Sequence, residues 1–590
     1  MSAYLFVHFT GEERNGEQVY FSVSQDGLHF QDLNQGLPVL YSNIGEEGVR
    51  DPFLIRDPNK EKFYLIATDL RIEKGLGWSH AQNHGSRDII IWESNDLIYW
   101  DGPRAVTVGL AEAGNVWAPE AIYDEKEGAF LVFWASKVED KHQMYAAYTQ
   151  DFKVFGNPFI FLTKESDVID STVAYDKGYY YRFTKDETDS RILMERSKAL
   201  TGDYETIYSP VLAELAGVEG PQIYQLSDGK TWCLIVDQFA EGKGYMILQT
   251  TDLSSGEFKV LSLADYHFGQ TKKRHGSVLP ITDQEYQRLL HYYDQKNPVL
   301  SGLYADPDLV CFDGRYYLYP TTDGFPGWSG DSFSVFTSRD LQQFENAGEI
   351  INLTTEQVPW AVGNAWAPCI TKRNGTYYYY FCGKRPDGQS CIGMAQSHSP
   401  TGPFIAEKEP ILTPEMIKQY DLDMAQMIDP SIYEEDGSYY ILFGNGNTGA
   451  IAKLTNDMTA IHQDTIQTLI GLEDFREAVT VLKRDGIYHF TWSCDDTGNE
   501  NYHVNYGISY NLFGPIEFIY AILTKNPAKD ILGTGHHSIL KLPNQDKYYI
   551  AYHRFGTPLS QYPDGKGFHR EICISPLDFD QNGLIRPVIV

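Results

Sequence analysis

Residues 302–324 read GLYADPDLVCFDGRYYLYPTTDG, a stretch that places Asp306 directly before a proline at the start of a strand-forming run. Residues 48–70 repeat the arrangement as GVRDPFLIRDPNKEKFYLIATDL, with Asp51 before a proline. Because proline lacks a backbone donor, an Asp-Pro step interrupts a sheet ladder and fixes the direction of the acid beside it. The two stretches therefore predict the same strand–turn–strand unit, each with a carboxylate at its edge.

The repeat extends along the whole chain of 590 residues, which indicates an internal duplication. Five landmarks of the first half recur in the second half in the same order and at a nearly constant offset. The pairs are Trp78 and Trp328, Trp117 and Trp366, Asp170 and Asp429, Glu219 and Glu477, and His275 and His536. A chain of this length is too long for one core, so the duplication predicts two homologous domains.

Strand-forming residues alternate with turns almost throughout both halves. Residues 19–30, VYFSVSQDGLHF, read as a hairpin around an Asp-Gly turn. Similar strand pairs recur about every 40 to 60 residues, which is the period of a propeller blade, and a half of about 260 residues then holds roughly five blades. The predicted fold class is therefore all-β, with two tandem five-bladed β-propellers.

The two propellers are expected to close differently. The first half has little strand after His275, so residues 1–40 are expected to supply its missing blade, whereas the second half continues through enough strand to complete its own. Thr282 and Glu285 have the spacing of a capping box and open a predicted helix that ends near Asp294. The predicted domains are an N-terminal propeller over 1–280, a helical connector over 281–299 and a C-terminal propeller over 300–590.

The composition argues against several classes of partner. A formal net charge of −32 opposes binding to nucleic acid or an anionic membrane, because both would repel the surface, and it leaves neutral substrates open. The N-terminus has neither a basic leader nor a spanning apolar run, so the chain is expected in the cytoplasm. The seven cysteines form no framework and are expected as free thiols. Nothing in the sequence predicts the oligomeric state.

Three acids in each half lie on three different predicted blades, whose side chains converge only at a propeller axis. Two carboxylates at one site suit hydrolysis of a glycosidic bond, with a third acid that sets orientation and pKa. An acid in a turn is also a common structural residue, but matching positions in both halves favour a catalytic role. The six acids are Asp51, Asp170 and Glu219 in the first half, and Asp306, Asp429 and Glu477 in the second.

Both halves contain an ordered set of short motifs. The second half has ADPD, NAWAP, IDPS, REA and GTGHHS, and it ends in YHRF and FHREICISPLDFD. This set resembles glycoside hydrolase family 43, whose inverting arabinofuranosidases, xylosidases and arabinanases are five-bladed propellers. The first half is similar to the same family through RDPF, NVWAPE, IDST, EGPQ and RHGS. Together the two matches cover nearly the whole chain.

The resemblance implies a role for each of the six acids. The general bases are Asp306 and Asp51, the modulators of pKa are Asp429 and Asp170, and the general acids are Glu477 and Glu219. In such a site the base stays ionised while the acid holds its proton, and an inverting pair lies about 6.5 to 9.5 Å apart. Glu477 precedes Ala-Val where Gly-Pro is commoner, but no acid is missing, so both halves are expected to be active.

The resemblance also implies residues around the sugar. Arg570 in FHRE resembles the family's arginine that contacts substrate, and Arg554 in YHRF is a second candidate. His275 and His536 are expected on the axis, in water-mediated contact with a bound ion, often calcium, while the chemistry itself needs no cofactor. Each histidine is alternatively a satisfied core residue. Four tryptophans either stack on a sugar ring or pack between blades: Trp78, Trp117, Trp328 and Trp366.

These expectations combine into one hypothesis about function. The chain is expected to be an exo-acting, inverting glycoside hydrolase that releases terminal α-L-arabinofuranosyl groups from oligosaccharides derived from arabinan or arabinoxylan. A β-xylosidase, or one activity in each half, is the alternative among enzymes. A glycan-binding protein without catalysis is the alternative from another class, and the retained acids argue against it, because a binder needs no three carboxylates per site.

Overall fold

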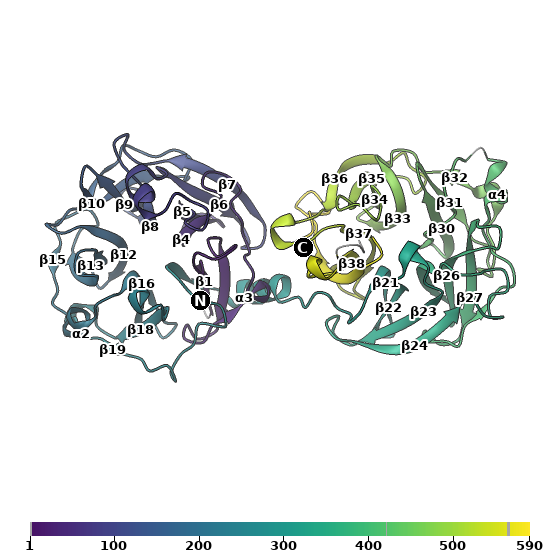
Figure 1. The fold of residues 1–590 in the computed structure, drawn as a ribbon, viewed down its shortest axis with the longest axis horizontal. Helices are drawn as coiled ribbons and strands as arrows, with labels where there is room; N and C mark the ends of the chain where they lie inside the picture. Colours follow the sequence, from purple (N-terminus) through teal and green to yellow (C-terminus); the bar gives the residue numbers. More distant parts are fainter. Residues whose placement is uncertain (1–2, 421, 563–566) are drawn as a thin grey trace. The chain divides into compact units, whose positions relative to one another are not determined.

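The computed structural model describes residues 3–420, 422–562 and 567–590, and β-strands are their dominant secondary structure (Figure 1). The chain divides into two compact units, Met1–Asp294 and Gln295–Val590. The prediction of an all-β fold with two domains is confirmed. The α-helices are short, and none in the described ranges is long and apolar enough to cross a membrane. They are α1 (Trp78–His84), α2 (Pro210–Glu214), α3 (Asp283–Tyr293) and α4 (Pro414–Lys418).

The described residues of the first unit form five antiparallel sheets of four strands each. The first sheet joins the N-terminal strands to the strand that follows His275, in the order β20 (Gly276–Ile281), β1 (Ala3–His8), β2 (Tyr20–Ser24) and β3 (Gln31–Asp32). The others are β4 (Val49–Arg56), β5 (Phe63–Asp69), β6 (Asp88–Ser94) and β7 (Trp100–Thr107); β8 (Trp117–Asp124), β9 (Ala129–Val138), β10 (Lys141–Thr149) and β11 (Phe159–Leu162); β12 (Val168–Asp176), β13 (Tyr179–Asp186), β14 (Arg191–Ser197) and β15 (Glu205–Thr206); and β16 (Glu219–Gln225), β17 (Trp232–Asp237), β18 (Tyr245–Thr250) and β19 (Lys259–Val260).

The second unit repeats this pattern with small differences. Its sheets are β21 (Tyr304–Phe312), β22 (Arg315–Thr322), β23 (Ser332–Ser338) and β24 (Phe344–Asn352); β25 (Trp366–Arg373), β26 (Thr376–Lys384), β27 (Ser390–Ser397) and β28 (Ile405–Ala406); β29 (Ser431–Glu435), β30 (Ser438–Asn445), β31 (Thr448–Lys453) and β32 (Gln467–Thr468); β33 (Phe475–Arg484), β34 (Ile487–Cys494), β35 (His503–Ser509) and β36 (Glu517–Leu523); and β37 (Gly535–Lys541), β38 (Tyr548–Phe555) and β39 (Arg570–Leu577). The pairing of Asn445 with Glu477 joins β30 to β33.

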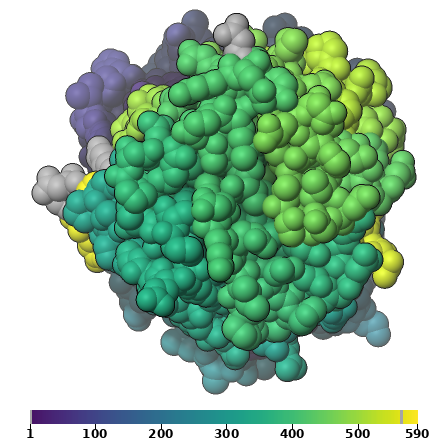
Figure 2. All heavy atoms as spheres, turned by 90° about the vertical axis from the view of Figure 1, so that its right-hand side faces the viewer, coloured from purple at the N-terminus to yellow at the C-terminus, as the bar shows by residue number. Residues whose placement is uncertain are grey.

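The first strands of the sheets contact one another in a closed order within each unit. In the first unit, β4 contacts β8 and β20, β12 contacts β8 and β16, and β16 contacts β20. In the second unit, β21 contacts β25 and β37, β29 contacts β25 and β33, and β33 contacts β37. Figure 1 shows β4, β8, β12 and β16 toward the middle of the first unit and β21, β33 and β37 toward the middle of the second, with β7 and β24 at the edge. Figure 2 views the second unit from the side of β27, β31 and α4. Residues at the start of the inner strands therefore share one central region in each unit.

Neighbouring sheets enclose apolar clusters that hold them together. Between the sheets that contain β5 and β9, the cluster includes Ile66, Ile91, Val132 and Trp134, each at most 1% exposed. Complete burial of one such side chain contributes about 1.5–3 kcal/mol. The alternation of apolar residues along the strands supplies these clusters. All seven cysteines are free, as the sequence predicts.

Helix α3 lies at the end of the first unit, where the sequence predicts a helix. The Thr282 side chain accepts a hydrogen bond from the backbone of Glu285, and the Glu285 side chain accepts one from the backbone of Thr282. This reciprocal pair is the predicted capping box, and the helix ends at Asp294. Arg56 donates to both carboxylate oxygens of Glu285 at 2.8 Å, so the helix start is also tied to β4.

Candidate active sites

Inner strands of the second unit bring together the three acids that the sequence predicts there. Asp306 and Glu477 lie at register shifts near the start of β21 and β33, and Asp429 lies just before β29. Asp306 and Asp429 have left-handed backbones, with φ of 49° and 60°. Such bulges turn a side chain out of the sheet, often beside active sites. With His536 of β37, the three acids line a pocket of 120 Å³.

Asp306 lies within a set of basic side chains. Arg570 donates to Asp306 Oδ1 at 3.1 Å from Nη1 and to Asp323 Oδ2 at 2.8 Å from Nε. His553 Nδ1 and His536 Nδ1 lie 3.1 and 3.3 Å from the same oxygen of Asp306. Burial alone would raise the pKa of Asp306, but Arg570 and the two histidines outweigh burial and hold this pKa well below its usual range. Asp306 is therefore ionised and suited to accept a proton.

Glu477 is held mainly by neutral donors. Tyr502 donates to Oε1 at 2.8 Å, and Asn445 Nδ2 donates to Oε2 at 2.7 Å. Arg476 approaches Oε2 only to 3.7 Å and donates instead to Asp496. Burial raises the pKa of Glu477 above its usual value. The carboxyl group of Glu477 is therefore suited to hold a proton and to donate it.

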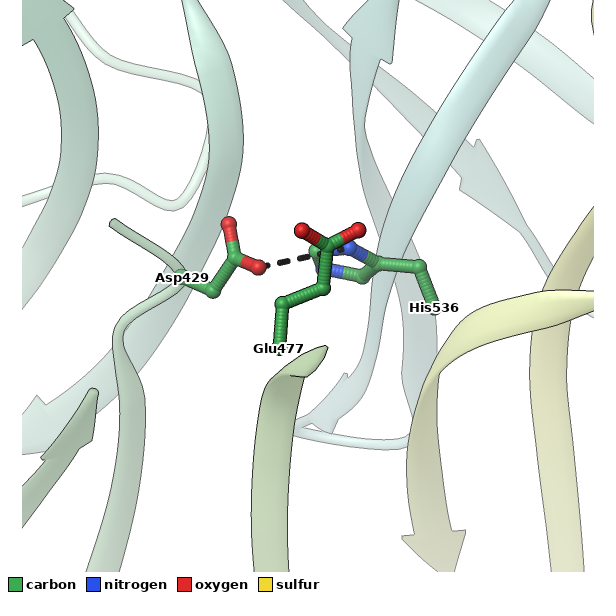
Figure 3. A group of neighbouring side chains, drawn as sticks. All are labelled: Asp429, Glu477 and His536. Atoms are coloured by element: carbon green, nitrogen blue, oxygen red, sulfur yellow. Dashed lines mark ion pairs between the residues drawn. The ribbon is translucent and has the colours of Figure 1, made fainter. Parts of the chain in front are cut away.

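Asp429 lies beside Glu477 and His536, and the three side chains converge in Figure 3. Their nearest ligand-type atoms lie within 4.8 Å of one another. Burial, followed by the charges of Glu477 and Asp306, raises the pKa of Asp429 well above its usual value. Two neighbouring buried carboxyl groups do not both ionise readily. Asp429 is therefore held neutral beside Glu477, and burial lowers the pKa of His536, which leaves that ring neutral as well.

The first unit repeats the geometry around Asp51, Asp170 and His275. His275 Nδ1 lies 3.4 Å from Asp51 and 3.8 Å from Asp170, close to the distances of His536 in the second unit. Burial opposes the charge of His275, but Asp170 and Asp51 outweigh it and raise the pKa of His275 to about 9. Burial would raise the pKa of Asp51, but the hydrogen bond with His275 holds it below its usual value. Burial raises the pKa of Asp170 to about 6. The base position is again ionised.

Glu219 has different partners from its counterpart Glu477. Lys185 Nζ lies 2.9 Å from Glu219 Oε2, and Arg274 Nη2 lies 2.9 Å from Oε1. Each oxygen of Glu219 therefore has a cation as its partner. The pocket of the first unit is also larger, at 410 Å³.

Two family models match the chain and together account for both units. The description "Probable glycosyl hydrolase domain" matches residues 1–287, and "Glycosyl hydrolases family 43" matches residues 295–585. A β-D-galactofuranosidase of Aspergillus niger is 32% identical over 311 residues, which cover 50% of this chain and 84% of that protein. The chain belongs to glycosyl hydrolase family 43. It is therefore a glycoside hydrolase.

Other relatives in family 43 carry different substrate names. An α-L-arabinofuranosidase of Bifidobacterium longum is 32% identical over 290 residues, which cover 40% of this chain and only 27% of that protein. A xylosidase/arabinosidase of Bacteroides ovatus is 28% identical over 341 residues, which cover 49% of this chain and 97% of that protein. The crystal structure of a thermostable family-43 glycoside hydrolase is 25% identical, with a TM-score of 0.43, and the match covers 50% of this chain and 96% of that one.

The family resemblance implied a calcium ion near the axis, and the two units differ in how well they fit it. In the second unit, His536 and Asp429 border both the acid pocket and a second cavity of 310 Å³. Calcium prefers oxygen ligands, and this cavity offers them from Asp308, Ser431, Thr480 and Ser538. In the first unit, the pKa of His275 is raised to about 9, and a protonated ring can accept no hydrogen bond from a water bound to an ion.

The two pockets contain all of the residues predicted for the sites except Arg554. Arg554 donates to Glu571 instead. Trp328 and Trp366 border the second pocket, and Trp78 and Trp117 border the first. Arg570 is only 3% exposed, lines the pocket and donates to Asp306, so it fixes the position of that carboxylate.

Sequence motifs missed the side chains that hold the two glutamates. Tyr502 and Asn445 hold Glu477, and Lys185 and Arg274 hold Glu219. Arg274 is the first residue of the RHGS motif, but the motif drew attention only to His275, and the other three belong to no motif that indicates catalysis. Comparison of the two halves could have identified Lys185 and Arg274, because the matching residues of the second half, Gly444 and Gly535, are not charged.

Proposed function

We propose that this family 43 chain is an exo-acting, inverting glycosidase whose chemistry takes place in the second unit. One observation carries the proposal: in the same small pocket, Asp306 is held ionised by Arg570 while burial favours the protonated form of Glu477. A glycosidase that inverts needs this pair of opposite protonation states, one carboxylate as base and one carboxylic acid. A pocket of 120 Å³ suits one terminal sugar better than the middle of a polymer.

In this mechanism, Asp306 removes a proton from the water that attacks the anomeric carbon. Glu477 donates its proton to the glycosidic oxygen as the bond to the leaving group breaks. Burial and the charge of Asp306 raise the pKa of the acid, Asp429 is the neighbouring carboxyl group that we propose as its modulator, and Arg570 fixes the direction of the base. Both carboxyl groups are restored when the product leaves and protons exchange with solvent.

The substrate that we propose is a short, neutral oligosaccharide with a terminal α-L-arabinofuranosyl group. Relatives named for arabinofuranose and galactofuranose support a furanose in the pocket. Relatives named xylosidase/arabinosidase and β-xylosidase support the second candidate, a β-xylosidase or a protein with both activities. Trp328 and Trp366 supply aromatic faces at the pocket that suit either ring.

We also infer that each unit is a five-bladed propeller with the site at its axis. The closed order of contacts among five inner strands in each unit supports this assignment. We further infer that the cavity of 310 Å³ in the second unit, near Asp308 and His536, holds a structural calcium ion. When bound, such an ion would supply local positive charge and rigidity below the acids, without a part in the proton transfers.

The test is hydrolysis of 4-nitrophenyl α-L-arabinofuranoside and β-D-xyloside, with the anomeric form of the first product followed by proton NMR. We expect the arabinofuranoside to be the better substrate and the product to have inverted configuration. Asp306→Asn, which removes only the base, should lower kcat by about 10²- to 10⁴-fold with an unchanged circular dichroism spectrum. Product of retained configuration, or full activity of Asp306→Asn, would refute the mechanism.

A further inference from the structure

Glu219, the predicted acid of the first unit, is bound by two cations. Lys185 is buried, and its Nζ lies 2.9 Å from Glu219 Oε2 and 2.6 Å from Glu187. Arg274 is fixed between Glu219 Oε1 at 2.9 Å and Asp237 Oδ2 at 2.6 Å. A charge-assisted bond occupies each oxygen, so Glu219 could take up a proton only if one of these ion pairs broke, whereas the two hydrogen-bond donors to Glu477 are neutral. A general acid needs that proton.

Neither cation exists at the matching place in the second unit. The pairing of Thr172 with Phe183 corresponds to that of Ser431 with Leu442, which places Gly444 at the position of Lys185. Arg274 precedes His275, and Gly535 precedes His536. A side chain at Gly535 is excluded, because its Cβ would lie 2.3 Å from the ring of Tyr502, the phenol that holds Glu477. The second unit has therefore replaced two ion pairs with neutral donors around the same carboxyl group.

From this geometry we propose that the pocket of the first unit binds a neutral oligosaccharide without cleaving it. The pocket of 410 Å³ is more than three times the volume of the second one and still has the sugar-facing features of the family. Trp78 is 44% exposed at its border, and Trp117 and Phe239 line it with further aromatic surface. Aromatic faces of this kind stack against sugar rings.

The charges in this pocket favour a neutral ligand over an anionic one. Four cationic side chains line it, and each is bound by two carboxylates: Arg50 by Glu12 and Glu17, Lys185 by Glu187 and Glu219, Arg274 by Asp237 and Glu219, and His275 by Asp51 and Asp170. A uronic acid would have to compete with these carboxylates for every cation. The hydroxyl groups of a neutral sugar can instead donate to the same carboxylates. The ligand class, a neutral pentose oligosaccharide, is the one part of this proposal that rests on the proposed function.

The experiment measures binding and hydrolysis in the full chain that carries Glu477→Gln. We expect this variant to have lost hydrolysis of arabinotriose while isothermal titration still shows the trisaccharide binding in the first unit. Adding Trp78→Ala should weaken that binding event at least about tenfold, or about 1.4 kcal/mol. Leu76→Ala is the matched control, because Leu76 lies two residues before Trp78, is 79% exposed and does not line the pocket. Trigalacturonate, the anionic probe, should bind weakly or not at all.

Two results would overturn the proposal. One is hydrolysis that persists in Glu477→Gln and disappears when Glu219→Gln is added, which would make Glu219 an acid after all. The other is trisaccharide binding that Trp78→Ala leaves unchanged, with the same circular dichroism spectrum, which would leave the pocket without a ligand. Failure of the wild-type chain to hydrolyse any arabinofuranoside or xyloside would contradict the proposed function instead, and the binding result would still decide this inference.

Discussion

The hydroxyl group of Tyr502 influences whether Glu477 is protonated. Tyr502 donates to Glu477 Oε1 at 2.8 Å, and this bond favours the carboxylate, opposing the burial that raises the pKa of Glu477. Asp306, whose pKa lies well below its usual range, stays ionised as the pH falls. The rate is therefore expected to fall on the alkaline side as Glu477 loses its proton, and to persist far into the acid range.

Replacing Tyr502 by Phe removes the hydrogen bond that stabilises the anion, so the pKa of Glu477 should rise further. We expect the alkaline limb of kcat/KM for arabinofuranoside hydrolysis to move to higher pH while the acid limb stays in place. Tyr510→Phe is the control, because Tyr510 is 78% exposed and lies outside the pocket. If the alkaline limb moved to lower pH, or if the acid limb moved and the alkaline limb did not, Glu477 would not be the acid.

The six acids were predictable from sequence because each belongs to a repeated motif with a fixed neighbour, such as the proline after Asp306. Their partners were not predictable in the same way. Lys185 reaches Glu219 from β13 and Arg274 reaches it from the segment before β20, and these positions are a property of the folded sheets. Motifs mark the residues that react, whereas the side chains that set a protonation state are found only by their positions in space.

Bulged inner strands position the acids, and their left-handed residues are the weak points of this element. Ala478 follows Glu477 and has φ of 57°, in the left-handed region, where alanine is less strained than a β-branched residue. In the first unit a glycine, Gly220, follows Glu219 with φ of 54°. The two units thus keep the same local backbone with different small residues. The sequence shows that Ala-Val follows Glu477, whereas Gly-Pro follows Glu219. It does not show the bulge, which explains why a small residue follows the glutamate in both units.

Ala478→Val should destabilise the second unit by about 1–3 kcal/mol, because a β-branched residue is strained in the left-handed region. It should also lower kcat, since the adjacent Glu477 would move with the backbone. Ala478→Gly is the matched control and should keep both properties, because glycine adopts this conformation without strain. Urea denaturation and hydrolysis of the arabinofuranoside measure the two effects. Equal stability of the valine and glycine variants would show that the bulge carries no strain.

At the scale of the whole molecule, the duplication predicted two units, and the N-terminal residues expected to complete the first half do pair with the strand after His275. Val7 lies opposite Ser277, and Leu5 lies opposite Leu279. The capping box of α3 was also predictable, because its spacing is local in sequence. The difference between the two pockets was not predictable from the sequence, because the same three acids occur in both units and only their partners differ.

The second unit contains every residue that lines the proposed hydrolytic pocket, and the hydrogen bonds described here for Asp306 and Glu477 come from the same unit. Residues 295–590 expressed alone should therefore hydrolyse 4-nitrophenyl α-L-arabinofuranoside with the kcat of the full chain. The fragment should lack the trisaccharide binding event that we assign to the first unit, so titration calorimetry and kinetics on one sample separate the two activities. A fragment with a native circular dichroism spectrum and strongly reduced kcat would show that the first unit contributes to hydrolysis, and would contradict the assignment of the chemistry to the second unit alone.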